Sequence, residues 1–301
     1  MDSKAVRRIK AVRDRVLAMP GMTRAVQMLT VRRVIPRPVW LRLQPIGVVT
    51  VRPASGAPFR YRATAGDAMA KSVVWEHMRR WDISTQPVLA DLARTARVFV
   101  DGGTYTGVYT LLATAVNPDL RVVAFEANPP TARMLRGNLA LNGLEDRVRV
   151  VEEAMSDQVG MVDFFIPDDD PTAAALTSAG TRIRVPSTPA DVHLAGLDVD
   201  LVKLDLEGHE PAALRGMAET LKRCRPALIL ECLTAEALPP VRAVLDPLGY
   251  HDCLWLGPSG PVRADATVDC PKPFHPNFLF RARDAAAPTA APTTAQLGPA
   301  M

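Results

Sequence analysis

Residues 98–110 read VFVDGGTYTGVYT, an apolar run that ends on an acid and continues through a glycine-containing loop into a helical pattern. A strand, a glycine turn and a helix N-terminus together commonly bind a nucleotide phosphate. A dinucleotide fingerprint has glycines at positions 1, 3 and 6, but counting from Gly102 the third position is Thr104. The GK[ST] ending of a phosphate loop is also missing. The pattern that remains is an acid followed by glycines, at Asp101, Gly103 and Gly107.

The acid at the start of this loop restricts the ligand. A carboxylate directed into the site would repel a pyrophosphate, whereas it would pair with the ammonium of an amino-acid moiety. S-adenosylmethionine carries such an ammonium and a sulfonium, and it has no phosphate. The pattern around Asp101 therefore favours this cofactor.

A second acid supports the same ligand. Glu126 closes RVVAFEANP, where the end of the next strand would meet a ribose, and a carboxylate accepts hydrogen bonds from both ribose hydroxyls. NAD shares that need, so Glu126 alone does not separate the two cofactors. The third apolar run ends near the expected adenine. We assign these residues to the cofactor: Asp101, Gly102, Gly103, Gly107, Glu126, Ala127, Asn128, Glu153 and Ala154.

The segment VKLDLEGHE at 202–210 carries charges where a buried strand is expected. In a strand Lys203 and Asp205 share one face, and a parallel strand of a wound sheet is normally apolar on both faces. Charges near its carboxyl end therefore indicate a site. The alternative is a structural Lys203–Asp205 pair, followed by acids that favour a helix N-terminus.

S-adenosylmethionine is a methyl donor, and an alcohol acceptor, if that is the substrate, would need a group that removes the hydroxyl proton, or a metal that acidifies it. Asp205 is the first choice for this role, Glu231 in LILECL is a second base or ligand, and His209 is a further base candidate. Oxygen ligands such as Asp205 and Glu231 would favour magnesium. The sequence does not decide whether a metal is present.

Short β-branched runs alternate with helical patterns between Val98 and Arg281. This alternation predicts a doubly wound, mostly parallel sheet with helices on both faces. The last two runs, GYHDCLWL and NFLFRA, have no clear helix between them and predict an antiparallel pair.

The chain resembles the FkbM-type methyltransferases, which depend on S-adenosylmethionine. The resemblance covers residues 75–283 and rests on VFVDGGTYTGVYTLLA, VVAFEANP, LALNGLEDRVRVVEEAMSDQVG, DLVKLDLEGHEPAALRG and NFLF. It implies the seven-stranded class I (Rossmann-like) methyltransferase fold and methylation of an oxygen, often on a sugar or a secondary metabolite. The family usually has Ala-Asn where this chain has Gly103 and Thr104.

Charge is distributed unevenly along the chain. Residues 1–62 hold 14 Lys and Arg against two acids, for +12, while the remainder holds 22 bases and 30 acids, for −8. The first 18 residues have the pattern of a basic amphipathic helix, which either packs on the body or a twin subunit, or contacts an acidic partner or anionic membrane. We divide the chain into a basic helical extension at 1–74, a methyltransferase domain at 75–283 and a disordered Ala/Pro/Thr-rich tail at 284–301.

Composition limits the other classes. No apolar run is long enough to cross a bilayer and no signal peptide is evident, so a cytoplasmic enzyme is expected. The four cysteines lack CxxC spacing, which argues against a zinc site. An NAD-dependent oxidoreductase and a nucleic-acid binder that uses the basic arm remain as alternatives. Nucleic acid is not expected as a partner, because the sequence offers no aromatic stacking platform. The expected partner is a small-molecule or glycoconjugate acceptor.

Overall fold

The computed structural model describes residues 13–17, 19, 21–32, 34–166, 181–232, 235–264 and 276–282. Most of the predicted N-terminal basic helix and the whole predicted tail at 284–301 lie outside these residues, as does Cys270. Cys224, Cys232 and Cys253 are free thiols. Among the described helices none is both long and apolar enough to cross a membrane.

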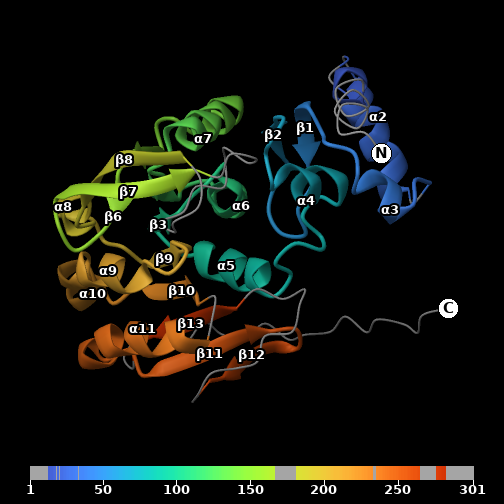
Figure 1. The fold of residues 1–301 in the computed structure, drawn as a ribbon. Helices are drawn as coiled ribbons and strands as arrows, with labels where there is room; N and C mark the ends of the chain where they lie inside the picture. Colours follow the sequence, from blue (N-terminus) through green and yellow to red (C-terminus); the bar gives the residue numbers. More distant parts are fainter. Residues whose placement is uncertain are drawn as a thin grey trace.

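The main sheet has the order β12-β11-β13-β10-β9-β3-β4-β5 (Figure 1). Its strands are β3 (Val98–Gly102), β4 (Arg121–Phe125), β5 (Val148–Val151), β9 (Leu201–Leu204), β10 (Ala227–Glu231), β11 (Asp252–Gly257), β12 (Gly260–Arg263) and β13 (Asn277–Arg281). The neighbouring strands β10, β9, β3, β4 and β5 run parallel to one another. Strand β13 is antiparallel to both β10 and β11. The predicted antiparallel pairing of the last two runs is therefore confirmed. The sheet has eight strands rather than seven, because a tight turn adds β12 at the edge.

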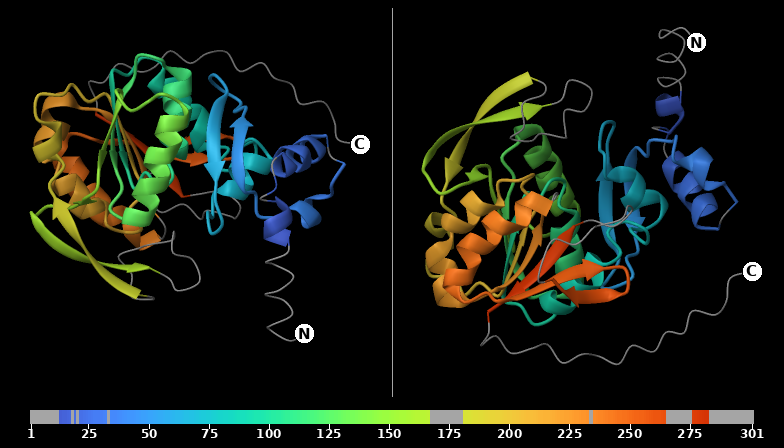
Figure 2. Two further views of the ribbon diagram at one scale, coloured as in Figure 1. Left: turned by 90° about the horizontal axis from the view of Figure 1, so that it is seen from above. Right: turned by 60° about the horizontal axis from the view of Figure 1, so that its bottom comes forward.

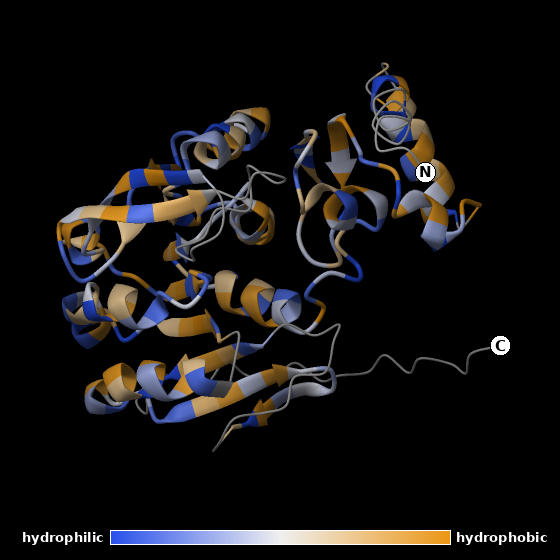
Figure 3. Ribbon diagram, in the orientation of Figure 1, coloured by the Kyte–Doolittle hydropathy of each residue, from blue (hydrophilic) through white to orange (hydrophobic). Residues whose placement is uncertain are grey.

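Helices cover both faces of the sheet, as predicted (Figure 2). One face packs against α4 (Ala70–Trp75), α5 (Thr85–Ala93), α6 (Val108–Val116) and α7 (Pro129–Leu141). The other packs against α8 (Asp191–Leu194), α9 (Glu210–Arg215), α10 (Ala218–Cys224) and α11 (Leu238–Leu245). Side chains alternate between the two layers: Phe99 and Leu201 belong to the first, Val100 and Val202 to the second. The central strands therefore carry apolar side chains on both faces, with Asp101 and Lys203 as buried exceptions. The covering helices are amphipathic, and the ribbon of α11 alternates between orange and blue in Figure 3.

The N-terminal segment contains a β-hairpin that the sequence did not predict. After α2 (Met22–Val31) and α3 (Arg37–Trp40), strands β1 (Gly47–Val51) and β2 (Phe59–Ala63) pair antiparallel. Val51 and Tyr61 are fully buried in the same cluster as Phe99. On the outer edge of β2, Asn138 of α7 and Asn142 at its C-cap accept hydrogen bonds from backbone N–H groups at 2.8 Å each. These bonds satisfy an edge strand that would otherwise be open, so the hairpin packs as part of the body.

A second, three-stranded sheet follows β5 in the chain. It consists of β6 (Ala154–Met155), β7 (Gly160–Ile166) and β8 (Thr181–Thr188) in the order β6-β8-β7. Two 3₁₀ turns, at Ala235–Ala237 and Asp246–Leu248, flank α11. The small sheet matters for the site because it brings Phe164 to the main pocket.

Candidate active site

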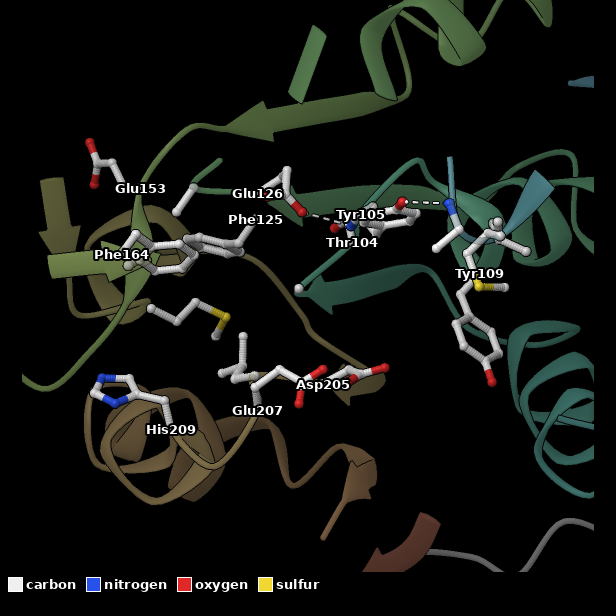
Figure 4. Close-up of a pocket in the computed structure, with 18 of the residues that line it drawn as sticks. Thr104, Tyr105, Tyr109, Phe125, Glu126, Glu153, Phe164, Asp205, Glu207 and His209 are labelled. Atoms are coloured by element: carbon white, nitrogen blue, oxygen red, sulfur yellow. Dashed lines mark hydrogen bonds between the residues drawn. The ribbon is translucent and has the colours of Figure 1, made fainter. Parts of the chain in front are cut away.

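A cavity of about 310 Å³ opens beyond the carboxyl ends of β3, β4 and β9 (Figure 4). This is where ligands bind in open parallel sheets. The predicted site residues that line it are Gly103, Glu126, Ala127, Glu153, Ala154, Asp205 and His209. The structure places the others behind this wall: Asp101, Gly102, Gly107, Asn128 and Glu231.

Gly103 holds the loops after β3 and β9 together. Its φ is +74°, and a Cβ at this position would lie 1.9 Å from the carbonyl oxygen of Asp205. The close approach is therefore between the backbone of this loop and that of Asp205. Gly107, with φ +91°, starts α6 in the same loop, and a Cβ there would lie 2.7 Å from Leu135. Only glycine combines these conformations with this little space.

Glu126 lies on the pocket wall with both carboxylate oxygens engaged. Oε2 accepts a hydrogen bond from the backbone N–H of Tyr105 at 2.8 Å, and Oε1 accepts one from the backbone N–H of Asn128 at 2.9 Å. Burial raises the pKa of Glu126 to about 7, against the opposing effect of these two N–H donors. The carboxylate has lone pairs left for two further donors, as ribose hydroxyls would supply. Asn128 occupies the N-cap position of α7, and its side-chain Nδ2 donates to Thr131 Oγ1.

Asp101 lies beneath the pocket. Its carboxyl accepts a hydrogen bond from Thr110 Oγ1 at 2.6 Å, and burial raises its pKa to about 6, although Lys203 acts in the opposite direction. The sequence predicted that this carboxylate faces the cofactor's ammonium. Strand alternation instead turns Asp101 toward α6, on the same face of the sheet as Lys203, its lateral neighbour.

Lys203 is a buried cation among three carboxylates. Its Nζ lies 3.0 Å from Asp205 Oδ2, and Asp205, Glu231 and Asp101 together keep the pKa of Lys203 above its ordinary value despite burial. The same Nζ lies 4.5 Å from the ring centroid of Tyr109, a cation–π distance. The Tyr109 hydroxyl donates to Asp82, to which Asn277 also donates. Lys203 therefore connects the sheet to the helix that follows the glycine loop.

The three candidate bases occupy different positions. Asp205 lines the pocket and is partly exposed, which leaves its carboxylate open to a bound substrate. Glu231 is buried and interacts with Lys203 behind the wall. His209 is half-buried at the start of α9, near the Phe164 end of the pocket and away from Tyr109 (Figure 4). Burial lowers the pKa of His209, so its ring is neutral at physiological pH.

The residues proposed as metal ligands do not fit a divalent ion. Among the described residues no three His, Cys, Asp or Glu side chains are grouped so that they could hold a metal. Asp205 and Glu231 both interact with Lys203, whose ammonium already supplies positive charge between them. A magnesium ion there would meet a buried like charge.

One end of the pocket has the features expected for an adenine site. Strand β5 ends at Val151, Glu153 follows it, and Ala154 begins β6. Glu153 contacts His193 at 3.1 Å, and His193 packs edge-on against Phe125. Phe164 of β7 completes this apolar end.

The other end is built by residues that the sequence did not single out. Ala68, Met69 and Trp81 line it together with Tyr105 and Tyr109. Trp81 and Tyr109 are in ring contact, with centroids 4.8 Å apart. One feature of the sequence could have indicated this end, a tyrosine inside the glycine loop. Tyr105 has φ +54°, and its hydroxyl accepts a hydrogen bond from the backbone N–H of Ala68 at 3.2 Å.

The turn that carries Trp81 is strained. His77, Met78 and Asp82 have φ of +51°, +66° and +41°, in a region that non-glycine residues rarely adopt. Such backbone conformations cost of order 1–3 kcal/mol each and persist where surrounding contacts fix them. Here Gln86 donates to the carbonyl oxygens of Met78 and Trp81. The turn is therefore held in place next to the pocket.

Comparison with known proteins identifies relatives of this chain. The methyltransferase FkbM domain family matches residues 101–251. Over 198 residues the chain is 27% identical to 2-O-methyltransferase NoeI of Sinorhizobium fredii, which covers 58% of this chain and 79% of that protein.

Two solved structures show partial similarity. Methyltransferase FkbM from Methylobacillus flagellatus aligns with a TM-score of 0.44 and 15% identity over 72% of this chain. The alignment spans 55% of that protein's chain, so only about half of it has a counterpart here. An S-adenosylmethionine-dependent O-methyltransferase from Thermotoga maritima aligns with a TM-score of 0.40 and 15% identity, covering 78% of this chain and 77% of the other.

Proposed function

Because the chain belongs to the methyltransferase FkbM domain family, we propose that it transfers a methyl group from S-adenosylmethionine to a hydroxyl oxygen of a small molecule, a sugar or a secondary metabolite. The position of Asp205 is the observation that favours oxygen as the methyl acceptor. Its carboxylate is open to the pocket beside Gly103, where a bound acceptor would need a base. The name of the relative, a 2-O-methyltransferase, supports the same acceptor atom.

The pocket residues fit the cofactor in size and chemistry. Glu126 would accept hydrogen bonds from the ribose hydroxyls, and the apolar end around Ala154 and Phe164 would take the adenine. Gly103 and Thr104 line the pocket between these two parts, where the amino-acid portion would lie. When bound, S-adenosylmethionine supplies an electrophilic methyl group on a sulfonium.

Asp205 removes the proton of the acceptor hydroxyl. Bound S-adenosylmethionine would supply the methyl carbon for in-line attack by the acceptor oxygen and its sulfur as the leaving group, and the carboxylate of Asp205 would take the proton. Lys203 fixes the side chain of Asp205 through the 3.0 Å contact, so that little reorganisation is needed on binding. Alignment of the reacting atoms at about 3–3.5 Å can supply about 7–11 kcal/mol of the barrier reduction.

The acceptor enters at the end formed by Met69, Trp81 and Tyr109. Trp81 and Tyr109 offer ring surface on which an apolar or sugar ring can pack. Asp205 and the exposed Glu207 make this end acidic, which disfavours acceptors with a phosphate or carboxylate next to the hydroxyl. Ala68, Met69 and Trp81 lie outside the family match at 101–251, so acceptor choice would depend on residues beyond the matched region.

The test uses S-adenosylmethionine labelled with ¹³C in the methyl group and a panel of sugars, glycosides and polyphenols. Carbon NMR of the product distinguishes O-methyl from N-methyl and C-methyl by chemical shift. We expect O-methyl signals that depend on Asp205. Transfer to nitrogen or carbon alone would overturn the oxygen assignment, and calorimetric binding of NAD without binding of S-adenosylmethionine would overturn the cofactor.

A further inference from the structure

A second cavity, of about 530 Å³, lies between α2 and the β1–β2 hairpin, separate from the main pocket. Four arginines line it. Arg24 lies in α2 and Arg32 directly follows it, while Arg52 and Arg60 belong to the hairpin. No Asp or Glu is among its lining residues. In the described part of the chain none of the four guanidinium groups forms an ion pair, although ten other arginines do.

His77 adds a neutral donor to the arginines. Its Nδ1 accepts a hydrogen bond from the backbone N–H of Arg52 at 3.2 Å, so in the neutral ring the proton lies on Nε2. The ring lines the cavity from the strained turn that also carries Trp81 to the main pocket. The cavity therefore combines four cations with hydrogen-bond donors, the features that bind phosphate oxygens.

Apolar side chains border the same cavity. Met28, Val31 and Val48 line it and are 52%, 43% and 37% exposed, which is high for side chains of this type. Free phosphate cannot form apolar contacts with these side chains. An anionic lipid offers both a phosphate for the arginines and an acyl boundary for the apolar side chains.

We propose that the Arg24–Arg32–Arg52–Arg60 cavity binds the phosphate head group of an anionic phospholipid and so places this face of the protein on a membrane surface. The charge of +12 over residues 1–62 would add long-range attraction to the same surface. A second copy of this chain is a poorer occupant, because a two-fold interface would place the arginines of both copies against one another. The inference does not depend on the methyl acceptor.

The experiment is co-sedimentation of the full chain with vesicles of phosphatidylcholine alone or mixed in equal parts with phosphatidylglycerol. We expect binding only to the mixed vesicles. R52Q/R60Q should weaken it roughly 30-fold, because each basic side chain near an anionic surface contributes about one kcal/mol. The control is R121Q/R133Q, which removes two exposed arginines that line neither cavity and should bind like the parent. Circular dichroism and thermal melting check that all variants fold.

A second arm separates the lipid from soluble phosphate compounds. M28S/V31S changes only exposed side chains and should weaken binding to mixed vesicles while leaving the affinity for inorganic pyrophosphate unchanged. Pyrophosphate binding without vesicle binding would overturn the lipid assignment, as would binding to polyglutamate in place of vesicles. Equal binding to both kinds of vesicle, or unchanged binding by R52Q/R60Q, would overturn the role of the arginines.

Discussion

The ammonium of Lys203 and the carboxylate of Asp205 lie 3.0 Å apart, yet one is 2% exposed and the other 33%. The pair thus spans the wall of the main pocket, with its cation in the core and its anion toward the substrate. Buried cations need compensation, which Lys203 also receives from Asp101 and Glu231. A structural ion pair and a catalytic carboxylate, the two interpretations of VKLDLEGHE, are therefore compatible in one arrangement.

Replacing Asp205 with Asn removes the proposed base and keeps the size of the side chain. We expect turnover to fall about 10²- to 10⁴-fold, the usual scale for loss of a general base, with the Kd for S-adenosylmethionine little changed. Lys203 keeps two other carboxylates, so the variant should remain folded. Steady-state kinetics and calorimetry measure the two effects, with the exposed Asp119→Asn as control. Near-normal turnover would remove Asp205 from the catalytic residues and make His209 the next candidate.

Replacing Lys203 with Met tests the buried cation. Removing one partner of a buried ion pair typically costs about 3–5 kcal/mol, and here three carboxylates lose their counter-charge. Asp101 already has a pKa of about 6, and without Lys203 it would rise further. An acid with a raised folded pKa loses stability as pH rises, so the deficit should be larger near pH 8 than near pH 5. Urea unfolding at both pH values measures it; an equal deficit at both would show that the lost packing of the lysine stem dominates.

Ionisation of Glu126 should control the affinity for the cofactor. The carboxylate is the better acceptor for ribose hydroxyls, and its pKa of about 7 leaves it largely protonated at pH 6. Affinity should therefore increase as pH rises through about 7. In the free protein the sign is opposite: the raised pKa means that stability from this group is present below the ordinary value of 4.5 and lost as pH rises through about 7.

Calorimetry with S-adenosylhomocysteine over this pH range tests the effect of Glu126. Glu126→Gln should weaken binding roughly 10- to 100-fold at high pH, the worth of hydrogen bonds to a charged group, and should flatten the pH profile. Asp101 titrates in a neighbouring range, so Asp101→Asn serves as the comparison. A pH dependence that persists in Glu126→Gln and disappears in Asp101→Asn would assign the titration to Asp101 instead.

Gly103→Ala should separate the loops after β3 and β9. The new methyl group would overlap the Asp205 carbonyl, so we expect a stability loss of about 1–3 kcal/mol from overpacking and a weaker affinity for the cofactor. Gly143→Ala is a matched control: Gly143 also has positive φ, at +61°, but no atom lies within 4 Å of its Cβ position. Thermal melting of both variants, with and without S-adenosylhomocysteine, isolates the effect of close approach. Equal losses in the two would mean that backbone conformation alone explains the effect.

The alternating strands and helices could be predicted from the sequence, because hydrophobic periodicity and β-branched runs reflect local burial. The sequence also located Glu126 and Asp205, since strand ends mark the ligand side of a parallel sheet. It did not predict that Asp101 turns away from the pocket, which depends on strand alternation and on the lateral position of Lys203. It missed the β1–β2 hairpin because the basic charge of that segment obscured an alternating pattern at FRYRA. Trp81 was not predictable, since its place in the pocket depends on contacts between distant segments.

Replacing Trp81 should weaken binding of the acceptor without changing the affinity for the cofactor. Trp81 lines the pocket in ring contact with Tyr109, which lies at the end opposite Phe164 (Figure 4), and it belongs to a turn outside the family match. Trp81→Ala removes a stacking surface worth about 0.5–1.5 kcal/mol beyond its buried area, so KM for the acceptor should rise about tenfold while the Kd for S-adenosylmethionine is retained. Trp81→Phe keeps an aromatic ring and should recover most of the loss. If both variants instead lost cofactor binding to the same extent, Trp81 would act by holding the strained turn, and the acceptor would have to enter from another side.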